Sequence, residues 1–510
     1  MRHGRAAVSL ALLVTAVALG SLVARRYAAA GLVIRTVALG QLNLLSQTIV
    51  DQQAGRAVIL TGPQGPDPHC RVLVLDTHTG ALLSSVDVGT AAFAAVLDKR
   101  NGRIFVSAGN TGLGRVYMLD EKSGAVLRTV RVGWFPSALA LDERTGRLFV
   151  ANATISNPAG GPGTVSVLDV RSGQVLRSVT VGQRPEAVVV DESISRVFIM
   201  NAGSASVSVL DAASGRVLQT VPVGLDPTTL VIDQRTERAF AFGRHDVRVF
   251  DITRWRVVRT VALALHGSPI GIVDERAGRV LVVNTGSKVV PVLDARTGAL
   301  LYTLHVSGHP AWPTLDERSR RTYLIMGNNG MSTHLSVLET ATGRVLYTIP
   351  TPSYAGVVVD SQAGRFFVVT TNTVGTYDTR HGRLVRALTF GPKPLPPGPD
   401  EMIAPLFLVL APRARRAMVV DDVTARMSVL DVPSGTILHT IHVGPQPVAA
   451  LVDERAGHAL VISLGGGTEQ APDPWAWVPS WLWKRLSVLP QRASGPRTVP
   501  ASVTMIDVTR

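Results

Sequence analysis

The sequence predicts an all-β protein: a β-propeller of about ten four-stranded blades, closed by pairing of an N-terminal strand with the C-terminal blade. Three observations predict this fold. A similar unit recurs about every 44 residues along the 510-residue chain, and this is the period of a propeller blade. Each unit contains short runs rich in Val, Leu, Phe and Thr that are separated by turn residues. The two ends of the chain match complementary parts of one further unit.

Two alternating signatures define the unit. In the first, as in residues 141–152 (LDERTGRLFVAN), arginine follows an aspartate by five residues and leads an apolar run. In the second, as in residues 165–173 (VSVLDVRSG), glycine follows the aspartate by four residues. A hairpin loop that ends in a left-handed residue favours glycine, and an aspartate before it can accept hydrogen bonds from the loop. We therefore interpret these aspartates as structural, and we expect each arginine of the first signature to pair with the aspartate across its turn.

One complete unit spans residues 185–224 and shows four predicted strands, with the sequences EAVVVD, RVFIMN, SVSVLD and RVLQTVPV. The runs in the middle of the unit are apolar at nearly every position, which is typical of strands packed on both faces. Residues 31–40 (GLVIRTVALG) match a fourth strand that lacks its first three, and residues 503–510 (VTMIDVTR) match a third strand that lacks its fourth. Joining them would remove an open sheet edge. Ten units exceed the usual four to eight blades, so two smaller rings are the alternative to one wide ring.

The first thirty residues have the pattern of a targeting segment. Arg2 and Arg5 precede an apolar stretch over residues 6–24, and a small-residue run follows at residues 28–30. This pattern is typical of a cleaved secretory signal. An uncleaved membrane anchor formed by residues 6–24 is the alternative, since nineteen helical residues nearly cross a hydrocarbon core of about 30 Å. Either interpretation predicts that residues 31–510 are extracytoplasmic: secreted, periplasmic or anchored to a membrane.

The repeat sequences also resemble a known family. GRLFVAN at residues 146–152, its relatives ISRVFIMN and GRVLVVN, and the VxVLDxxTGxxLxTVxVG half of the unit are similar to the YVTN-repeat β-propeller family, often called YncE-like. The resemblance covers residues 31–510 except for insertions at 391–405 and 464–501. It implies a propeller outside the cytoplasm that acts as a binding or scaffold module, because members of this family share no common reaction.

In a propeller, the loops between second and third strands and the connections between blades open on the same side, which we call the connection face. The longest of these loops, residues 464–501, contains four tryptophans beside Lys484 and Arg485: Trp475, Trp477, Trp481 and Trp483. Tryptophan next to basic residues suits contact with a membrane surface through residues 475–485, or a clamp on a partner. The alternative is a lid that buries the indoles. Further binding candidates lie in the blade-to-blade connections, where residue types differ between units: Trp134, Arg184, Asp226, His266, His309, Trp312 and Tyr354.

Composition and motifs narrow the function classes. The formal net charge is +14 with 51 Lys and Arg, which favours polyanionic partners, and a lone Cys70 excludes a disulfide scaffold. The chain lacks the C-x-x-C-H, H-E-x-x-H and G-x-S-x-G motifs, a phosphate-binding Gly-Lys-Ser/Thr loop and EF-hand spacing. We therefore assign no catalytic residue, no metal ligand and no cofactor.

The sequence most favours an exported, non-enzymatic and monomeric binding or scaffold propeller, with an unknown protein, a glycan or another polyanion as its partner. One alternative is a propeller enzyme, either a lactonase-like hydrolase with a metal in the channel or a carrier of a non-covalent redox cofactor. The other alternative is a binder of polyanions such as single-stranded nucleic acid or acidic glycan.

Overall fold

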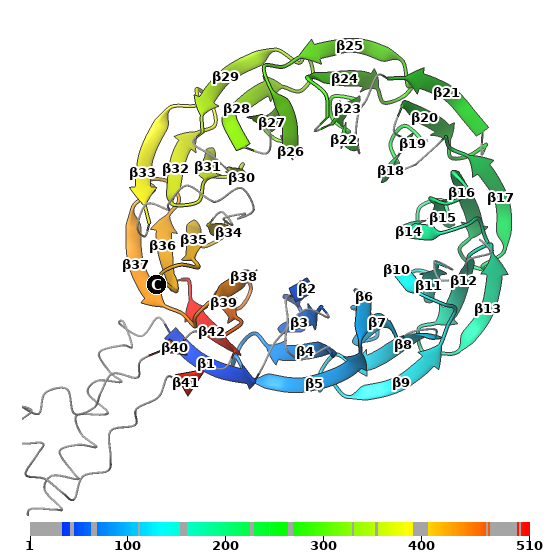
Figure 1. The fold of residues 1–510 in the computed structure, drawn as a ribbon, viewed down its shortest axis with the longest axis horizontal. Coiled ribbons are helices and arrows are strands. Elements are labelled where there is room, and N and C mark those ends of the chain that lie inside the picture. Colours follow the sequence, from blue (N-terminus) through cyan, green and yellow to red (C-terminus); the bar gives the residue numbers. More distant parts are fainter. Residues whose placement is uncertain are drawn as a thin grey trace, which may run out of the picture.

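Ten four-stranded antiparallel sheets follow one another around a wide central channel (Figure 1). The computed structural model describes residues 33–40, 45–62, 69–110, 113–153, 161–224, 229–243, 245–254, 256–263, 269–284, 286–328, 331–351, 355–390, 406–465, 468–469, 497–498 and 501–509. Blades are numbered from the one that contains β2, and strands within a blade run from the channel outward. The chain is a ten-bladed β-propeller.

The innermost strands, which line the channel, are β2 (Leu45–Asp51), β6 (Ala91–Asp98), β10 (Pro136–Asp142), β14 (Pro185–Asp191), β18 (Thr229–Asp233), β22 (Ile270–Asp274), β26 (His309–Asp316), β30 (Gly356–Asp360), β34 (Phe407–Ala411) and β38 (Pro447–Asp453). The second strands are β3 (Arg56–Thr61), β7 (Arg103–Asn110), β11 (Arg147–Asn152), β15 (Arg196–Asn201), β19 (Arg238–Phe242), β23 (Arg279–Val283), β27 (Arg321–Asn328), β31 (Arg365–Val369), β35 (Arg416–Asp421) and β39 (His458–Ser463).

The third strands are β4 (Cys70–Asp76), β8 (Leu113–Asp120), β12 (Thr164–Asp169), β16 (Ser206–Asp211), β20 (Asp246–Asp251), β24 (Val289–Asp294), β28 (Met331–Glu339), β32 (Thr373–Asp378), β36 (Arg426–Asp431) and β42 (Ala501–Asp507). The outermost strands are β5 (Leu82–Gly89), β9 (Val126–Arg131), β13 (Val175–Thr180), β17 (Val217–Pro222), β21 (Arg256–Ala262), β25 (Leu300–His305), β29 (Val345–Pro350), β33 (Leu384–Thr389), β37 (Ile437–His442) and β1 (Val33–Gly40). A separate pair, β40 (Thr468–Glu469) and β41 (Arg497–Thr498), belongs to the long insertion.

Blade four matches the strand prediction closely. Its strands β14 to β17 cover residues 185–191, 196–201, 206–211 and 217–222, within the unit predicted at residues 185–224. The second and third strands are buried at nearly every position, because each blade packs against a neighbour on both faces. The prediction from the apolar runs, that these strands are packed on both faces, is therefore confirmed.

The two ends of the chain complete blade ten together. Its sheet order is β1-β42-β39-β38, and β1 pairs antiparallel with β42 through partners such as Val37 and Val503. This is the pairing expected from the sequence. Because all ten sheets lie around one channel (Figure 1), the alternative of two smaller rings is wrong.

The junction between blades ten and one uses the same kind of link as other junctions. His458 occupies the position that carries arginine in the other units, and its Nδ1 donates to the Thr77 carbonyl of blade one at 2.8 Å. At the junction of blades five and six, Arg238 Nε donates to the Arg296 carbonyl at 2.9 Å. Thr77 Oγ1 in turn donates to Asp453 at 2.5 Å. The closing junction is therefore bonded as closely as an internal one.

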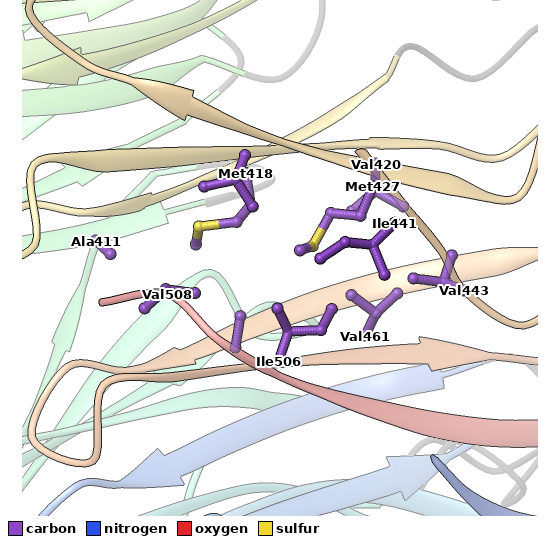
Figure 2. Packing of buried hydrophobic residues seen from close by; sticks show 11 residues of the cluster. Ala411, Met418, Val420, Met427, Ile441, Val443, Val461, Ile506 and Val508 are labelled. Atoms are coloured by element: carbon purple, nitrogen blue, oxygen red, sulfur yellow. The ribbon is translucent and has the colours of Figure 1, made fainter. Parts of the chain in front are cut away.

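Aliphatic side chains fill the space between adjacent blades. Figure 2 shows one such cluster, in which Met418 and Met427 of blade nine pack with Val461 and Ile506 of blade ten. All four side chains are fully buried. Since Val461 comes from β39 and Ile506 from β42, residues on both sides of the long insertion share this core. Burial of such side chains contributes about 1.5–3 kcal/mol each.

The turn chemistry matches the prediction for the second signature. Eight turn glycines have left-handed φ angles between 65° and 69°: Gly80, Gly124, Gly173, Gly215, Gly298, Gly343, Gly382 and Gly435. In blade four, Asp211 accepts the backbone N–H of Ser214 at 2.8 Å and its hydroxyl at 2.8 Å. These bonds, with the charge of Arg196, lower the pKa of Asp211. These aspartates hold their own turns, as we interpreted them.

The expected pairing of the first-signature arginines was wrong about the partner. Arg147 pairs with Asp169 of the neighbouring third strand at 2.8 Å, and Arg56 pairs likewise with Asp76 at 2.8 Å. The aspartate across the turn, Asp142, is fully buried and accepts the Thr145 N–H at 2.9 Å. Both aspartates lie opposite Arg147 in the strand register. Asp169 is partly exposed, as Arg147 is, whereas Asp142 is fully buried with its Oδ1 bonded to the turn.

The turn after each innermost strand also ends in a left-handed residue, and in some blades that residue is not glycine. Arg320 has a φ of 57°, whereas Gly364 holds the same position in the next blade at 64°. A left-handed residue with a Cβ costs about 1 kcal/mol. We expect Arg320→Gly to raise the free energy of unfolding by about 0.5–1 kcal/mol, measured by chemical denaturation. A loss of stability in this variant would contradict the account of the turn.

Candidate functional site

Within the described residues, three connections on the connection face share the pattern Gly-x-x-Pro and one backbone geometry. Their first residues are Gly133, Gly182 and Gly444, and their third residues are left-handed: Phe135 (φ 47°), Arg184 (φ 50°) and Gln446 (φ 51°). The carbonyl of each left-handed residue accepts a backbone N–H from the residue after the second strand, at 2.9, 2.9 and 3.0 Å. Glycine is required at the first position because, at Gly182, an added Cβ would lie 2.7 Å from the Cβ of Asn201. The same frame thus presents different side chains in blades three, four and ten.

At the entry to blade three, this frame presents aromatic side chains. Trp134 is 51% exposed and Phe135 is 40% exposed. The Phe135 ring lies 4.4 Å from the ring of Phe93 on β6, with an interplanar angle of 53°. Trp134 was a predicted candidate, and Phe93 and Phe135 were missed. The signal for Phe135 was its place in the same Gly-x-x-Pro connection, whereas nothing in the sequence indicated that Phe93 of the preceding blade reaches it.

Arg184 holds the equivalent place at the entry to blade four. Its Nε lies 2.8 Å from Glu186 Oε1, and both side chains are about half exposed. An exposed pair of this kind contributes little to stability. Blade four therefore has a charged pair in the connection where blade three has aromatic side chains.

Two histidines lie near the start of blade seven. His309 is the first residue of β26, and its Nδ1 is buried without a hydrogen-bond partner. His334 on β28 contacts Ser307 through Nε2 at 2.8 Å, and burial lowers the pKa of His334. Trp312 lies on β26 beside a break in the strand register between Ala311 and Thr314. Both histidines therefore lie on the side of blade seven that faces the connections.

The other predicted candidates lie outside the described residues: Asp226, His266, Tyr354, Trp475, Trp477, Trp481 and Trp483. The insertion at 391–405 also lies outside them. Of the insertion at 464–501, the structure describes a few residues at each end, including the β40–β41 pair, in which Thr468 and Glu469 face Thr498 and Arg497. In Figure 1 this pair is drawn outside the ring near β1.

The channel wall is mainly aliphatic. Apart from the residue that ends each strand, the ionisable side chains of the innermost strands are Glu186 and His309. Runs such as Val188–Val190 and Val357–Val359 are partly exposed. Within the described part of the chain, three or more metal-binding side chains gather nowhere, and no helix there is both long and apolar enough for a membrane span. The channel offers apolar surface rather than a cluster of charged groups.

One acidic pair is buried at the junction of blades one and two. Glu121 follows the third strand of blade two, is 3% exposed and faces Asp51 of blade one. Burial, followed by the charge of Asp51 and a hydrogen bond to it, raises the pKa of Glu121 from 4.5 to about 7. Other blades carry small or apolar residues at this position, such as Val170 and Ala295. Sequence reasoning missed the pair because its two members are 70 residues apart.

Replacing Glu121 should change how stability depends on pH. Because the pKa of Glu121 is higher in the folded chain than in the unfolded chain, its contribution is full below pH 4.5 and is lost as pH rises to about 7. We expect Glu121→Val to raise the free energy of unfolding by about 2 kcal/mol at pH 8, and by much less at pH 4. Denaturation at both pH values measures this.

Thr340→Val at the same position of blade seven is the matched control, because Thr340 is buried but carries no titratable group. Its effect should be the same at pH 4 and at pH 8. An effect of Glu121→Val that does not vary with pH would contradict the raised pKa of Glu121.

Comparison with known proteins gives one partial family match. The family model described as outer membrane protein assembly factor BamB matches residues 69–251, which is less than half of the chain. No curated protein matches the chain. The matched segment runs from the third strand of blade one to the third strand of blade five.

Three solved structures that match this chain share little sequence with it. The dihydro-heme d1 dehydrogenase NirN in complex with DHE is 14% identical, with a TM-score of 0.46, over 71% of this chain and 80% of that chain. A eukaryotic initiation factor is 10% identical, with a TM-score of 0.49, over 71% and 92%. BamB from Moraxella catarrhalis is 15% identical, with a TM-score of 0.41, over 68% and 97%.

Proposed function

We propose that this chain is an exported propeller that works as a binding or scaffold module and presents its connection face to a partner. The observation that carries the proposal is the shared Gly-x-x-Pro frame. It holds Trp134, Phe135 and Arg184 exposed at equivalent places in neighbouring blades, although their chemistry differs. Loops on a rigid scaffold are where binding residues concentrate, and tryptophan and arginine are common anchors of protein interfaces.

The proposed location is extracytoplasmic. Two observations support it: the targeting pattern of residues 1–30 and the match of residues 69–251 to a family named for an outer membrane protein assembly factor. Residues 6–24 serve either as a cleaved signal or as an anchor, and residues 475–485 would contact a membrane surface or the partner. We also propose that the repeats are of the YVTN type, on the strength of their sequences.

Site-specific photo-crosslinking in the native host tests the proposed face. Trp134→p-benzoylphenylalanine and Arg184→p-benzoylphenylalanine place the probe on the connection face. Arg276→p-benzoylphenylalanine places it on the turn between β22 and β23, on the opposite side of the ring. We expect discrete adducts from positions 134 and 184 and none from position 276. Adducts from position 276 alone, or from all three positions equally, would refute the proposed surface.

Fractionation of the same cells tests the location separately. We expect the chain in the extracytoplasmic fraction, either with an N-terminus near Ala30 when the signal is cleaved or with residues 6–24 retained in the membrane. Recovery of the full-length chain in the cytoplasm would contradict export without bearing on the crosslinking result.

A further inference from the structure

A cavity of about 530 Å³ opens on the face opposite the connection face, which we call the turn face because it carries the Asp-rich turns. Its polar lining comes from the turns after the innermost strands of four consecutive blades: Gln52 and Gln53 of blade one, Lys99 of blade two, Arg413 of blade nine and Arg455 of blade ten, with Asp51 below them. The cavity therefore spans the junction where the two ends of the ring meet.

The accessible charge in this cavity is positive. Lys99, Arg413 and Arg455 are exposed. Asp51 is 2% exposed, and its Oδ1 accepts the backbone N–H groups of Gln53 at 2.8 Å and Ala54 at 3.2 Å. Arg413 forms an ion pair with Glu454 of blade ten, with Nε 3.8 Å from Oε2, and Glu454 Oε1 accepts the Arg413 backbone N–H at 3.1 Å. Glu454 is thus one negative charge beside the three cations. An anion entering the cavity would meet ammonium and guanidinium groups first.

The same turn carries a neutralising acid more often in the blades outside this sector. The residue directly after the turn aspartate is glutamate in blades three, four, six and seven, namely Glu143, Glu192, Glu275 and Glu317. In the four blades around the cavity it is Pro412 in blade nine, Glu454 in blade ten, Gln52 in blade one and Lys99 in blade two. Glu143 shows what the acid does, since it pairs with Arg100 of the preceding blade at 3.2 Å. Glutamate thus follows the turn aspartate in four of the six other blades, but in one of the four blades around the cavity, so the turns of the cavity sector carry more uncompensated positive charge.

A second turn-face cavity provides the contrast. It has a volume of about 490 Å³ between blades five and six, and its lining mixes Arg235, Arg279 and Arg296 with Glu237 and Asp294. Asp294 pairs with Arg279 at 3.4 Å. This cavity thus has two carboxylates beside three cations, whereas the lining of the first cavity has one carboxylate, the buried Asp51, beside three cations. The second cavity therefore suits an anion less well.

We propose that the cavity between blades nine and two binds a small multivalent oxyanion, a molecule with several phosphate or carboxylate groups. Guanidinium groups match the geometry of such groups through paired hydrogen bonds, and an ammonium adds a point charge. The site is independent of the connection face and goes beyond the proposed function. A ligand held by blades nine, ten, one and two would also bridge the junction that closes the ring.

Isothermal titration calorimetry of the full-length chain at constant ionic strength tests the site, with tripolyphosphate as the phosphate probe and citrate as the carboxylate probe. The variant Lys99→Gln/Arg413→Gln/Arg455→Gln should weaken binding at least about tenfold. The matched control Arg235→Gln/Arg276→Gln/Arg318→Gln removes the same three charges from equivalent turns in blades five to seven, and it should change the affinity less than about twofold.

Binding of either probe with this difference between the two triple variants supports the site, and the probe that binds more tightly identifies the ligand group. Equal weakening of binding by both triple variants would mean that the probe responds only to the net charge of the chain, and it would overturn the proposal. The absence of binding by either probe would overturn it as well. If the triple variant does not fold, the single variants Lys99→Gln and Arg235→Gln replace the two triple variants. Lys99→Gln should then weaken binding more than Arg235→Gln does, by a smaller factor than the triple variant, and equal weakening would again overturn the proposal.

Discussion

Removing β1 is expected to cost about 5 kcal/mol of unfolding free energy and to lower the thermal midpoint strongly. The strand contributes Val37 and Leu39 to a cluster shared by blades ten and one, and Val33 to the cluster shared by blades nine and ten. Each buried aliphatic side chain contributes about 1.5–3 kcal/mol. The deletion also exposes the edge of β42, and an open edge favours aggregation. Thermal and chemical denaturation of chains that begin at residue 31 or at residue 41 measure the difference.

A peptide of residues 31–42 supplied in trans is the control for this deletion. It should restore much of the lost stability by pairing with β42, and a scrambled peptide should not. An unchanged thermal midpoint in the shorter chain would mean that the N-terminal strand is not needed to close the ring.

The replacement Gly298→Ala is expected to cost about 3 kcal/mol. Gly298 ends the turn between β24 and β25 with a φ of +68°, and an added Cβ would lie 2.5 Å from Cγ2 of Val249 in the preceding blade. The left-handed backbone accounts for about 1 kcal/mol, and overlap with the buried Val249 accounts for about 2 kcal/mol. The free energy of unfolding from denaturant titration measures the sum.

The replacement Gly364→Ala separates the two causes. Gly364 has a φ of +64°, but its added Cβ would come no closer than 3.7 Å, to Thr379 Oγ1. This control should lose about 1 kcal/mol. If both alanine variants lose the same unfolding free energy, the turn at Gly298 is not packed against the preceding blade as the structure describes.

The propeller fold was predictable because each blade repeats the same pattern of turn residues and apolar runs. The spacing of aspartate, glycine and arginine gave the strand boundaries within residues 185–224, and the matching sequences of the two ends gave the pairing of β1 with β42. Such features depend on neighbouring residues in the chain or on repetition. Both local patterns and repeats can be recognised in a single sequence.

The sites were less predictable because they depend on contacts between blades. Phe93 contacts Phe135, Glu121 faces Asp51, and Arg147 pairs with Asp169 rather than with Asp142, which is closer to it in the sequence. Each outcome follows from strand register or from the packing of one blade on the next. Only the ring geometry shows that Lys99, Arg413 and Arg455 line one cavity, since more than 300 residues separate the first from the second.

The closure of one ring by the two ends of the chain is the central claim, and an engineered disulfide tests it most directly. Thr36 and Thr504 are direct partners in the β1–β42 pair, and opposite residues of antiparallel strands lie within disulfide reach. The double variant Thr36→Cys/Thr504→Cys should form an intramolecular bond under mild oxidation. Peptide mass mapping would detect it, while Thr36→Cys/Thr376→Cys, with its second cysteine in blade eight, should form none. Free thiols at positions 36 and 504, or bonds only between molecules, would contradict the closed ring.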